Sequence, residues 1–157
     1  MRRILLTGMS GTGKSSVIEA IGARGCRAVD LDQPGWSVHA EDGDWIWNEQ
    51  RVWELLGADH DGPLFVSGCA ENQRRFYSYF DRVVLLSAPT DLIVERLRTR
   101  TNNPYGKYPS ELADVLRYVE TVEPLIRRGC THEIDTSVSL DEVVRQVLEI
   151  ADVEPAV

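Results

Sequence analysis

The sequence has few cysteines and no long apolar run. Its three cysteines, Cys26, Cys69 and Cys130, lie far apart, with no C-x-x-C pair and no histidine at ligand spacing. This predicts reduced thiols rather than a disulfide framework or a zinc site. No apolar stretch is long enough to cross a bilayer. The first apolar run ends at Thr7, which favours a first strand over a signal peptide. We therefore expect a cytoplasmic protein.

Positive charge is also scarce. The 17 Lys and Arg residues against 25 Asp and Glu give a formal net charge of −8, which argues against nucleic acid or an anionic membrane as the partner. A length of 157 residues suits one α/β domain with a sizeable core. Because there is no repeat or linker, we predict a single domain over residues 1–152, with a frayed tail at 153–157. We expect a small-molecule partner and a monomer or homodimer.

Short apolar strands alternate with helical patterns along the chain, which is typical of a parallel sheet covered on both faces. The predicted strands lie at about 3–7, 27–30, 64–67, 83–87 and 133–135. The predicted helices lie at about 15–23, 44–56, 71–79, 90–100, 110–128 and 140–150.

A glycine-rich motif follows the first predicted strand. Its residues 8–15 read G-x-x-x-x-G-K-S and precede a helix-compatible stretch, the context that a phosphate-binding P-loop requires. Glycines let the backbone curl until its N–H groups face phosphate oxygens, and the following helix adds the positive end of its dipole. The motif predicts nucleotide binding by Gly8, Met9, Ser10, Gly11, Thr12, Gly13, Lys14, Ser15 and Ser16.

Two side chains of this motif carry specific chemistry. Lys14 is long enough to reach the β- and γ-phosphates, and the Ser15 hydroxyl is a ligand for Mg²⁺. The alternative is a glycine-rich turn that matches by chance, which the flanking strand and helix disfavour.

The segment at about 101–109 contains two prolines, a glycine and paired asparagines, which disfavour regular structure. The helix before it ends in Arg96, Arg98 and Arg100. A loop that follows basic residues is typical of a lid over a nucleotide. A solvated connection whose arginines complement the helix dipole explains the pattern too, and both interpretations stay open.

Over nearly its whole length, the chain resembles the small P-loop kinases of the adenylate kinase, shikimate kinase and gluconate kinase group. The resemblance implies a three-layer α/β fold with a five-stranded parallel sheet in the order 2-3-1-4-5. It also implies that the P-loop, a lid at about 101–109 and an acceptor-binding segment at about 33–62 meet at one edge of the sheet. ATP and Mg²⁺ are the cofactors that it implies.

Arg96 and Arg100 resemble the two arginines that precede the lid of adenylate kinases. The resemblance implies that Arg96 covers the base of ATP and that Arg100 contacts its phosphates. Their spacing puts both on one helix face, and a guanidinium either stacks on a ring or binds phosphate. Whether Lys107 brings a positive charge to the site when the lid closes stays open.

The sequence Val29-Asp30-Leu31-Asp32 resembles the Asp-x-Asp of shikimate and gluconate kinases. The resemblance implies that Asp30 lies near Mg²⁺ and that Asp32 holds the acceptor hydroxyl. Residues i and i+2 share a face of an extended chain, and open α/β sheets bind ligands at the carboxyl ends of their strands. A polar strand exit with a turn-forming Asp is the other interpretation.

The chain departs from nucleoside monophosphate kinases where those bind the acceptor phosphate. Glu71 stands where an arginine is expected, and residues 35–62 contain one arginine, Arg51, against seven acidic residues. A dianionic acceptor is therefore disfavoured. The Gly-Gly-Gly of shikimate kinase is absent too, so neither named substrate is carried over. We expect a small polar metabolite that contacts Asp30, Asp32, Arg51 and Gly68.

Four tryptophans, Trp36, Trp45, Trp47 and Trp53, lie in the acceptor-binding segment. They form an aromatic platform for a sugar ring or base, or else Trp45 and Trp53 are core anchors of the predicted helix. Arg117 and Arg127, in the helix after the lid, are either acceptor contacts or surface residues.

These observations predict a kinase that uses ATP and Mg²⁺ to phosphorylate a hydroxyl of a small polar metabolite. Lys14, Asp32 and Arg100 are its predicted catalytic residues, with Ser15 and Asp30 at the metal. A nucleoside monophosphate kinase is the first alternative. The second is a nucleotide-binding ATPase or regulator, although the Asn-Lys-x-Asp motif of GTPases is missing.

Overall fold

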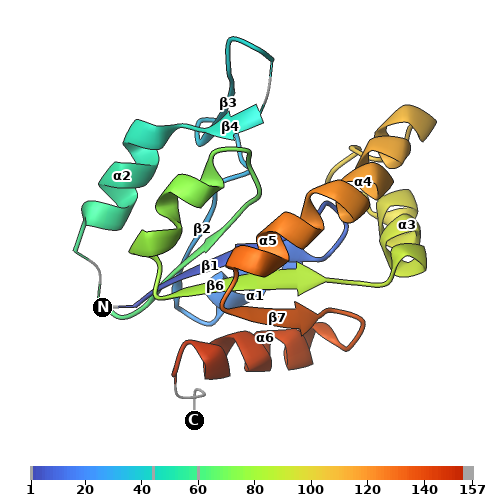
Figure 1. Cartoon of the computed structure of the whole chain (residues 1–157). Coiled ribbons are helices and arrows are strands. Elements are labelled where there is room, and N and C mark those ends of the chain that lie inside the picture. Colours follow the sequence, from blue (N-terminus) through green and yellow to red (C-terminus); the bar gives the residue numbers. More distant parts are fainter. Residues whose placement is uncertain (1, 44, 60, 154–157) are drawn as a thin grey trace.

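A five-stranded parallel sheet forms the centre of the computed structural model, which describes residues 2–43, 45–59 and 61–153 (Figure 1). The sheet order is β2-β5-β1-β6-β7. Counted in chain order, this is the predicted order 2-3-1-4-5, so the predicted fold class is confirmed. The bounds of the strands are β1 Arg3–Thr7, β2 Arg27–Asp30, β5 Leu64–Ser67, β6 Arg82–Ser87 and β7 His132–Asp135.

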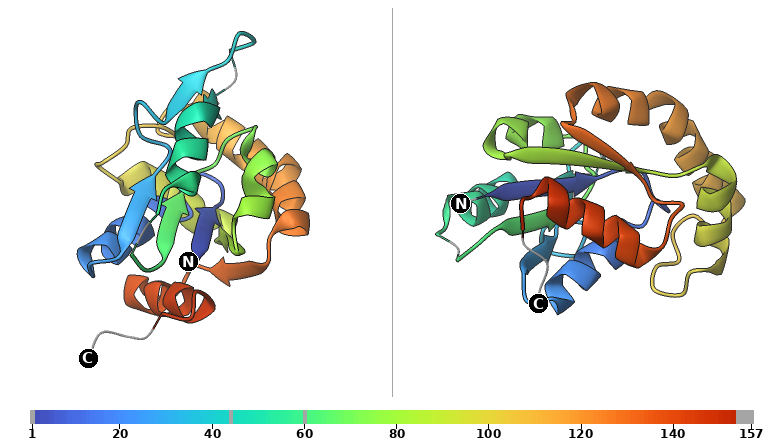
Figure 2. Two further views of the ribbon diagram at one scale, coloured as in Figure 1. Left: turned by 90° about the vertical axis from the view of Figure 1, so that its left-hand side faces the viewer. Right: turned by 90° about the horizontal axis from the view of Figure 1, so that it is seen from below.

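Helices cover both faces of the sheet (Figures 1 and 2). Along β1, Ile4 and Leu6 pack against α1 (Lys14–Ala23) and α6 (Leu140–Ile150), whereas Leu5 packs on the opposite face. This alternation within an unbroken apolar run is what a strand buried on both faces requires. The opposite face is covered by α2 (Glu49–Gly57), the 3-10 helix η1 (Gln73–Tyr79) and α5 (Glu123–Gly129).

A short hairpin replaces the start of the helix predicted at 44–56. Its strands β3 (Ser37–His39) and β4 (Trp45–Trp47) pair antiparallel, and Figure 2 shows the hairpin projecting from the body of the domain. Helix α2 begins only after Asn48, whose side chain accepts a hydrogen bond from the Arg51 amide. The aromatic and β-branched residues before this cap favour a strand, and the predicted start at residue 44 lies outside the described residues.

The helix predicted at 110–128 is two helices. Helix α4 (Pro109–Thr121) ends before Val122, and α5 restarts with Pro124 in its first turn. A proline has no N–H to continue the earlier helix but fits the first turn of a new one. Helix α4 packs against α3 (Thr90–Thr99). Among the described residues, no helix has the length and apolar character that a membrane span needs.

The carboxyl ends of the strands bring the predicted site residues to one edge of the sheet. The P-loop follows β1, Asp32 lies just beyond β2, Gly68 follows β5, and the lid follows α3. Of the tail predicted at 153–157, residues 154–157 lie outside the described residues.

Candidate active site

The P-loop wraps tightly between β1 and α1. Gly13 is the N-cap of α1 in the left-handed conformation, with φ of 98°, and no side chain caps this helix end. Gly8 has φ of 151°, and a Cβ atom there would lie 2.3 Å from the carbonyl oxygen of Leu86. Both positions therefore need glycine. The helix end lacks a side-chain cap, as expected where the first-turn N–H groups bind an anion.

Lys14 lies inside the loop rather than in solvent. Its Nζ donates to the carbonyl oxygens of Gly8 at 2.7 Å and Met9 at 3.0 Å, and the residue is 9% exposed. The ammonium is thus held at the centre of the curl that the sequence predicted. A fixed positive charge at this place is suited to a polyphosphate.

A hydrogen-bonded group around Thr136 fastens the P-loop to β7 and α3. The Thr136 hydroxyl lies 2.7 Å from the Thr12 carbonyl oxygen, and Arg96 donates to the Thr136 hydroxyl at 2.8 Å. Arg96 also donates to the carbonyl oxygens of Thr136 and Gly11. Both terminal nitrogens of the guanidinium are therefore engaged, so the base contact predicted for Arg96 would use the flat face of the group.

Arg100 joins the lid to the P-loop. Its guanidinium donates to the Ser10 hydroxyl at 3.2 Å and to the lid carbonyl oxygens of Asn103 and Tyr105. Burial lowers the pKa of both Arg96 and Arg100, yet a guanidinium stays charged in proteins. Lys107 instead donates to the carbonyl oxygen of Arg98 at 2.8 Å.

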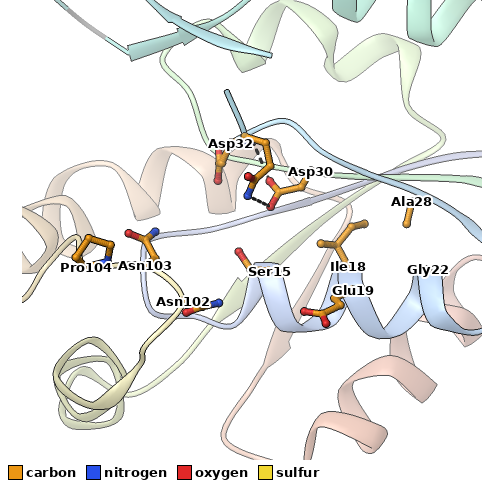
Figure 3. Close-up of a pocket in the computed structure, with 11 residues that line it drawn as sticks. Ser15, Ile18, Glu19, Gly22, Ala28, Asp30, Asp32, Asn102, Asn103 and Pro104 are labelled. Carbon is orange, nitrogen blue, oxygen red and sulfur yellow. Dashed lines mark hydrogen bonds between the residues drawn. The ribbon is translucent and has the colours of Figure 1, made fainter. Parts of the chain in front are cut away.

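Asp30 and Asp32 lie side by side above the start of α1 (Figure 3). Asp30 accepts hydrogen bonds from the Asp32 amide at 2.9 Å and the Gln33 side chain at 3.2 Å, so it forms the turn of the second interpretation. The Asp32 carboxylate accepts from the Cys69 amide at 3.1 Å. Burial raises the pKa of Asp32, while the charge of Lys14 and the Cys69 amide oppose that rise. A carboxylate with a raised pKa is a better proton acceptor.

The residues near the P-loop fit the sparse protein ligation of Mg²⁺. No group of three or more His, Cys, Asp or Glu residues in the described part of the chain is arranged for a metal. Magnesium, however, commonly takes one or two protein oxygens, with phosphates and water completing the shell. Ser15 and Asp30 provide such oxygens beside one cavity. Ser67, the register partner of Asp30, has a buried hydroxyl that makes no hydrogen bond to any described residue.

Trp47 and Gly68 form the other wall around Asp32. A Cβ atom on Gly68 would lie 3.1 Å from both the Asp32 Oδ1 and the Trp47 Nε1 atoms, so both groups approach the same glycine. Asn72 pins the backbone of Trp47 by accepting from its amide at 2.9 Å and donating to its carbonyl oxygen at 3.0 Å. Within the described ranges the buried indole Nε1 has no hydrogen-bond partner, a condition that typically costs about 1–3 kcal/mol.

The tryptophan interpretations need correction. Trp47 is the fully buried member of the set, whereas Trp45 is 41% and Trp53 38% exposed. Those two are therefore not core anchors of the predicted helix. The Trp45 ring contacts His39 within the hairpin, and the partly exposed Trp53 ring packs against Phe76 and Tyr79. Trp36 lies under the guanidinium of Arg51, 4.1 Å from its ring centroid.

Arg51 and Arg127 are engaged away from the P-loop. Arg51 donates to the Gly35 carbonyl oxygen at 2.6 Å, which holds it at the base of the hairpin. Arg127 pairs with Glu123 and Glu133, as the surface interpretation of this residue implies. Arg51 lies outside the linings of the two cavities described next.

Two adjoining cavities flank the P-loop. The larger, of about 560 Å³, is drawn in Figure 3 and is lined by polar residues of α1, the β2 exit and the lid, among them Ser15, Asp30, Asp32, Asn102 and Asn103. The second, of about 410 Å³, lies over Gly11 and Gly13 and is bounded by Arg96, Arg100 and Thr136. Residues Ser15 and Asp32 line both. Such adjoining cavities suit a triphosphate in one and an acceptor at its end.

Sequence reasoning missed several of these residues. Thr136 follows the last strand, so its place at the carboxyl edge of the sheet was a usable signal. Ser67 and Asn72 had no comparable signal, because their importance rests on contacts between distant segments. Trp47 was named only as one of four tryptophans in the acceptor-binding segment, and nothing in the sequence distinguished it from the others. Asn102 and Asn103 belong to the predicted lid and line both cavities.

Comparison with known proteins yields matches in sequence and in fold. A family model described as an AAA domain matches residues 4–117. Among curated proteins, a nucleotide-binding protein of Burkholderia mallei is 31% identical over 149 residues, which covers 87% of this chain and 49% of that protein. The chain thus spans about half the length of the curated relatives that it matches.

Solved structures share the fold at lower identity. A shikimate kinase from Acinetobacter baumannii in complex with shikimate has a TM-score of 0.68 at 18% identity, covering 96% of this chain and 92% of that one. A gluconokinase from Sinorhizobium meliloti has a TM-score of 0.63 at 24% identity, covering 96% and 91%. The fold implied by the resemblance to small P-loop kinases is thereby confirmed.

Proposed function

The chain belongs to the AAA domain family, and we propose that it is an ATP- and Mg²⁺-dependent kinase that phosphorylates a hydroxyl of a small polar metabolite. The observation that carries the proposal is the position of Lys14 and Asp32. Lys14 is fixed inside the P-loop, and its charge acts on the Asp32 carboxylate beside the neighbouring cavity. A cation suited to phosphate and a proton acceptor are thus close enough to interact electrostatically, at the place where phosphoryl transfer would occur. The nucleotide binding in the name of the Burkholderia relative and the kinases that share the fold support it.

The P-loop residues of this chain hold the triphosphate. Backbone N–H groups of residues 8–16 surround the phosphates, and Lys14 neutralises charge as the bond to the β-phosphate breaks. Arg96 presents its flat face to the base, while Arg100 keeps the lid against Ser10. In the proposed reaction the lid excludes water from the transferring phosphate, so that hydrolysis does not compete with transfer.

Asp32 acts on the acceptor. Its carboxylate orients the acceptor hydroxyl and takes its proton, for which the raised pKa is suited. Ser15 and Asp30 would hold the Mg²⁺, which supplies charge neutralisation to the phosphate oxygens when it is bound. The described residues lining the larger cavity carry carboxylates, carboxamides and hydroxyls but no Lys or Arg. This lining favours a neutral acceptor over a phosphorylated one.

A coupled assay of ADP release tests this function. Purified protein with MgATP is offered neutral polyols, sugar acids, shikimate, nucleosides and nucleoside monophosphates, with Lys14→Ala as the control. The proposal expects saturable, Lys14-dependent phosphorylation of a neutral hydroxyl compound. Phosphorylation of a monophosphate would indicate a nucleoside monophosphate kinase instead. Steady ADP release that no acceptor stimulates would indicate an ATPase, and either result would overturn the proposal.

A further inference from the structure

Trp47 holds a hydrogen-bond donor that no group in the described part of the chain accepts. The side chain is fully buried, and its Nε1 has no partner. Buried polar groups are nearly always paired in folded proteins, so an unpaired one calls for a specific explanation. Asn72 binds both backbone groups of Trp47, so the indole N–H has a defined position in the fold.

The donor shares a wall with the carboxylate of Asp32. Both groups lie 3.1 Å from the point that a Gly68 side chain would occupy. No hydrogen bond joins them to each other, and the Asp32 Oδ1 atom instead accepts from Cys69. One donor, from β4, and one acceptor, from the segment after β2, therefore both lie against Gly68 in the loop that follows β5.

We propose that the Trp47 indole N–H binds an oxygen of the phosphoryl acceptor, next to the hydroxyl held by Asp32. This inference rests on the proposed function. It defines the acceptor as a neutral compound with oxygens on adjacent carbons, that is, a polyol or sugar. A hydroxyl donates to the carboxylate while the neighbouring oxygen accepts from the neutral indole, and no charge is needed on the ligand.

Binding requires the contact between the Trp47 indole and Gly68 to open, because that contact covers the indole nitrogen and neither residue lines the two cavities. The backbone of Trp47 stays bound to Asn72, so the opening is confined to the indole side chain and the loop around Gly68. The new hydrogen bond to the ligand oxygen then satisfies the indole.

Trp47→Phe removes the N–H and keeps an aromatic ring. The matched control is Trp53→Phe, at an exposed position of α2. We expect wild-type enzyme and the control to prefer ribitol or sorbitol over analogues that lack the adjacent hydroxyl by roughly tenfold in kcat/KM. Trp47→Phe is expected to lose this preference, with a raised KM for the polyol and an unchanged KM for ATP. An unchanged preference would overturn the inference.

A second readout needs no turnover. In ¹H–¹⁵N spectra, the indole signal absent from the Trp47→Phe spectrum identifies Trp47 in the wild type. Titration with ribitol, sorbitol or myo-inositol is expected to shift that signal saturably. A shift without phosphorylation would contradict the proposed function alone. Phosphorylation of a polyol with a static Trp47 signal would overturn this inference alone, and a static signal with every polyol would overturn it as well.

Discussion

The two sides of the P-loop differ in how fully their polar groups are paired. On the nucleotide side, Arg96 and Thr136 link three segments of the chain through hydrogen bonds. On the acceptor side, the indole of Trp47 and the hydroxyl of Ser67 are buried without hydrogen-bond partners among the residues that the structure describes. The nucleotide side is therefore preorganised, whereas the acceptor side keeps unsatisfied groups that a ligand or metal-bound water would complete.

The strongest test of this difference removes the cation from the nucleotide side. Lys14→Ala is expected to lower kcat/KM for ATP roughly 10³-fold, because no other side chain replaces a charge fixed inside the loop. The control is Lys107→Ala, which removes the chain's other lysine from an exposed lid position. Steady-state kinetics gives kcat/KM for ATP in both variants. Equal losses of kcat/KM in the two variants would mean that the position of Lys14 inside the loop is not what catalysis requires.

Packing of the P-loop backbone is tested by Gly8→Ala. Its new Cβ would meet the Leu86 carbonyl oxygen at 2.3 Å, so we expect a loss of about 3 kcal/mol in the free energy of unfolding. Gly25→Ala is the control, since Gly25 has φ of 89° with nothing within 4 Å. We expect it to cost only about 1 kcal/mol. Urea denaturation measures both, and similar losses would refute the role of the β6 contact.

The bonds around Thr136 are expected to contribute to nucleotide affinity. Thr136→Val keeps the shape but removes the hydroxyl that contacts Thr12 and Arg96. A weakening of ATP binding of about tenfold is expected, as for the loss of one or two hydrogen bonds. Calorimetric Kd values for this variant and for Thr121→Val, at an exposed hydroxyl of α4, provide the comparison. An unchanged Kd in Thr136→Val would count against preorganisation of this side.

On the acceptor side we expect a smaller change, and one that stabilises the protein where the preceding substitutions weaken stability or binding. Because burial raises the pKa of Asp32, the folded state holds this proton more tightly than the unfolded chain. The contribution of Asp32 to stability therefore falls as pH rises from the ordinary carboxyl pKa to the raised one, and stays low above it. Asp32→Asn is expected to stabilise the protein at pH 7 while abolishing activity.

The control for that prediction is Asp30→Asn, which weakens the bonds to the Asp32 amide and Gln33. It is expected to destabilise the protein by about 1 kcal/mol. Urea midpoints at several pH values distinguish the two variants. If Asp32→Asn were destabilising at neutral pH, the carboxylate would be a structural group rather than a strained functional one.

Much of the nucleotide side could be predicted from local sequence. The P-loop is contiguous, and the apolar pattern was enough to predict the strands of the sheet. The order of those strands came from the resemblance to small P-loop kinases. The acceptor side was harder, because its geometry depends on contacts between distant segments such as Asn72 with Trp47. The three-residue strands of the hairpin are too short for a periodic signal, and Pro124 was overlooked as the start of α5.

The direct test of nucleotide binding is a titration with MgATP followed by backbone amide NMR. If the P-loop holds the triphosphate, amide signals of residues 8–16 shift together and saturate at one nucleotide per chain. If those signals stay unchanged while MgATP binds elsewhere or not at all, the P-loop is not the phosphate site and the proposed kinase has no basis.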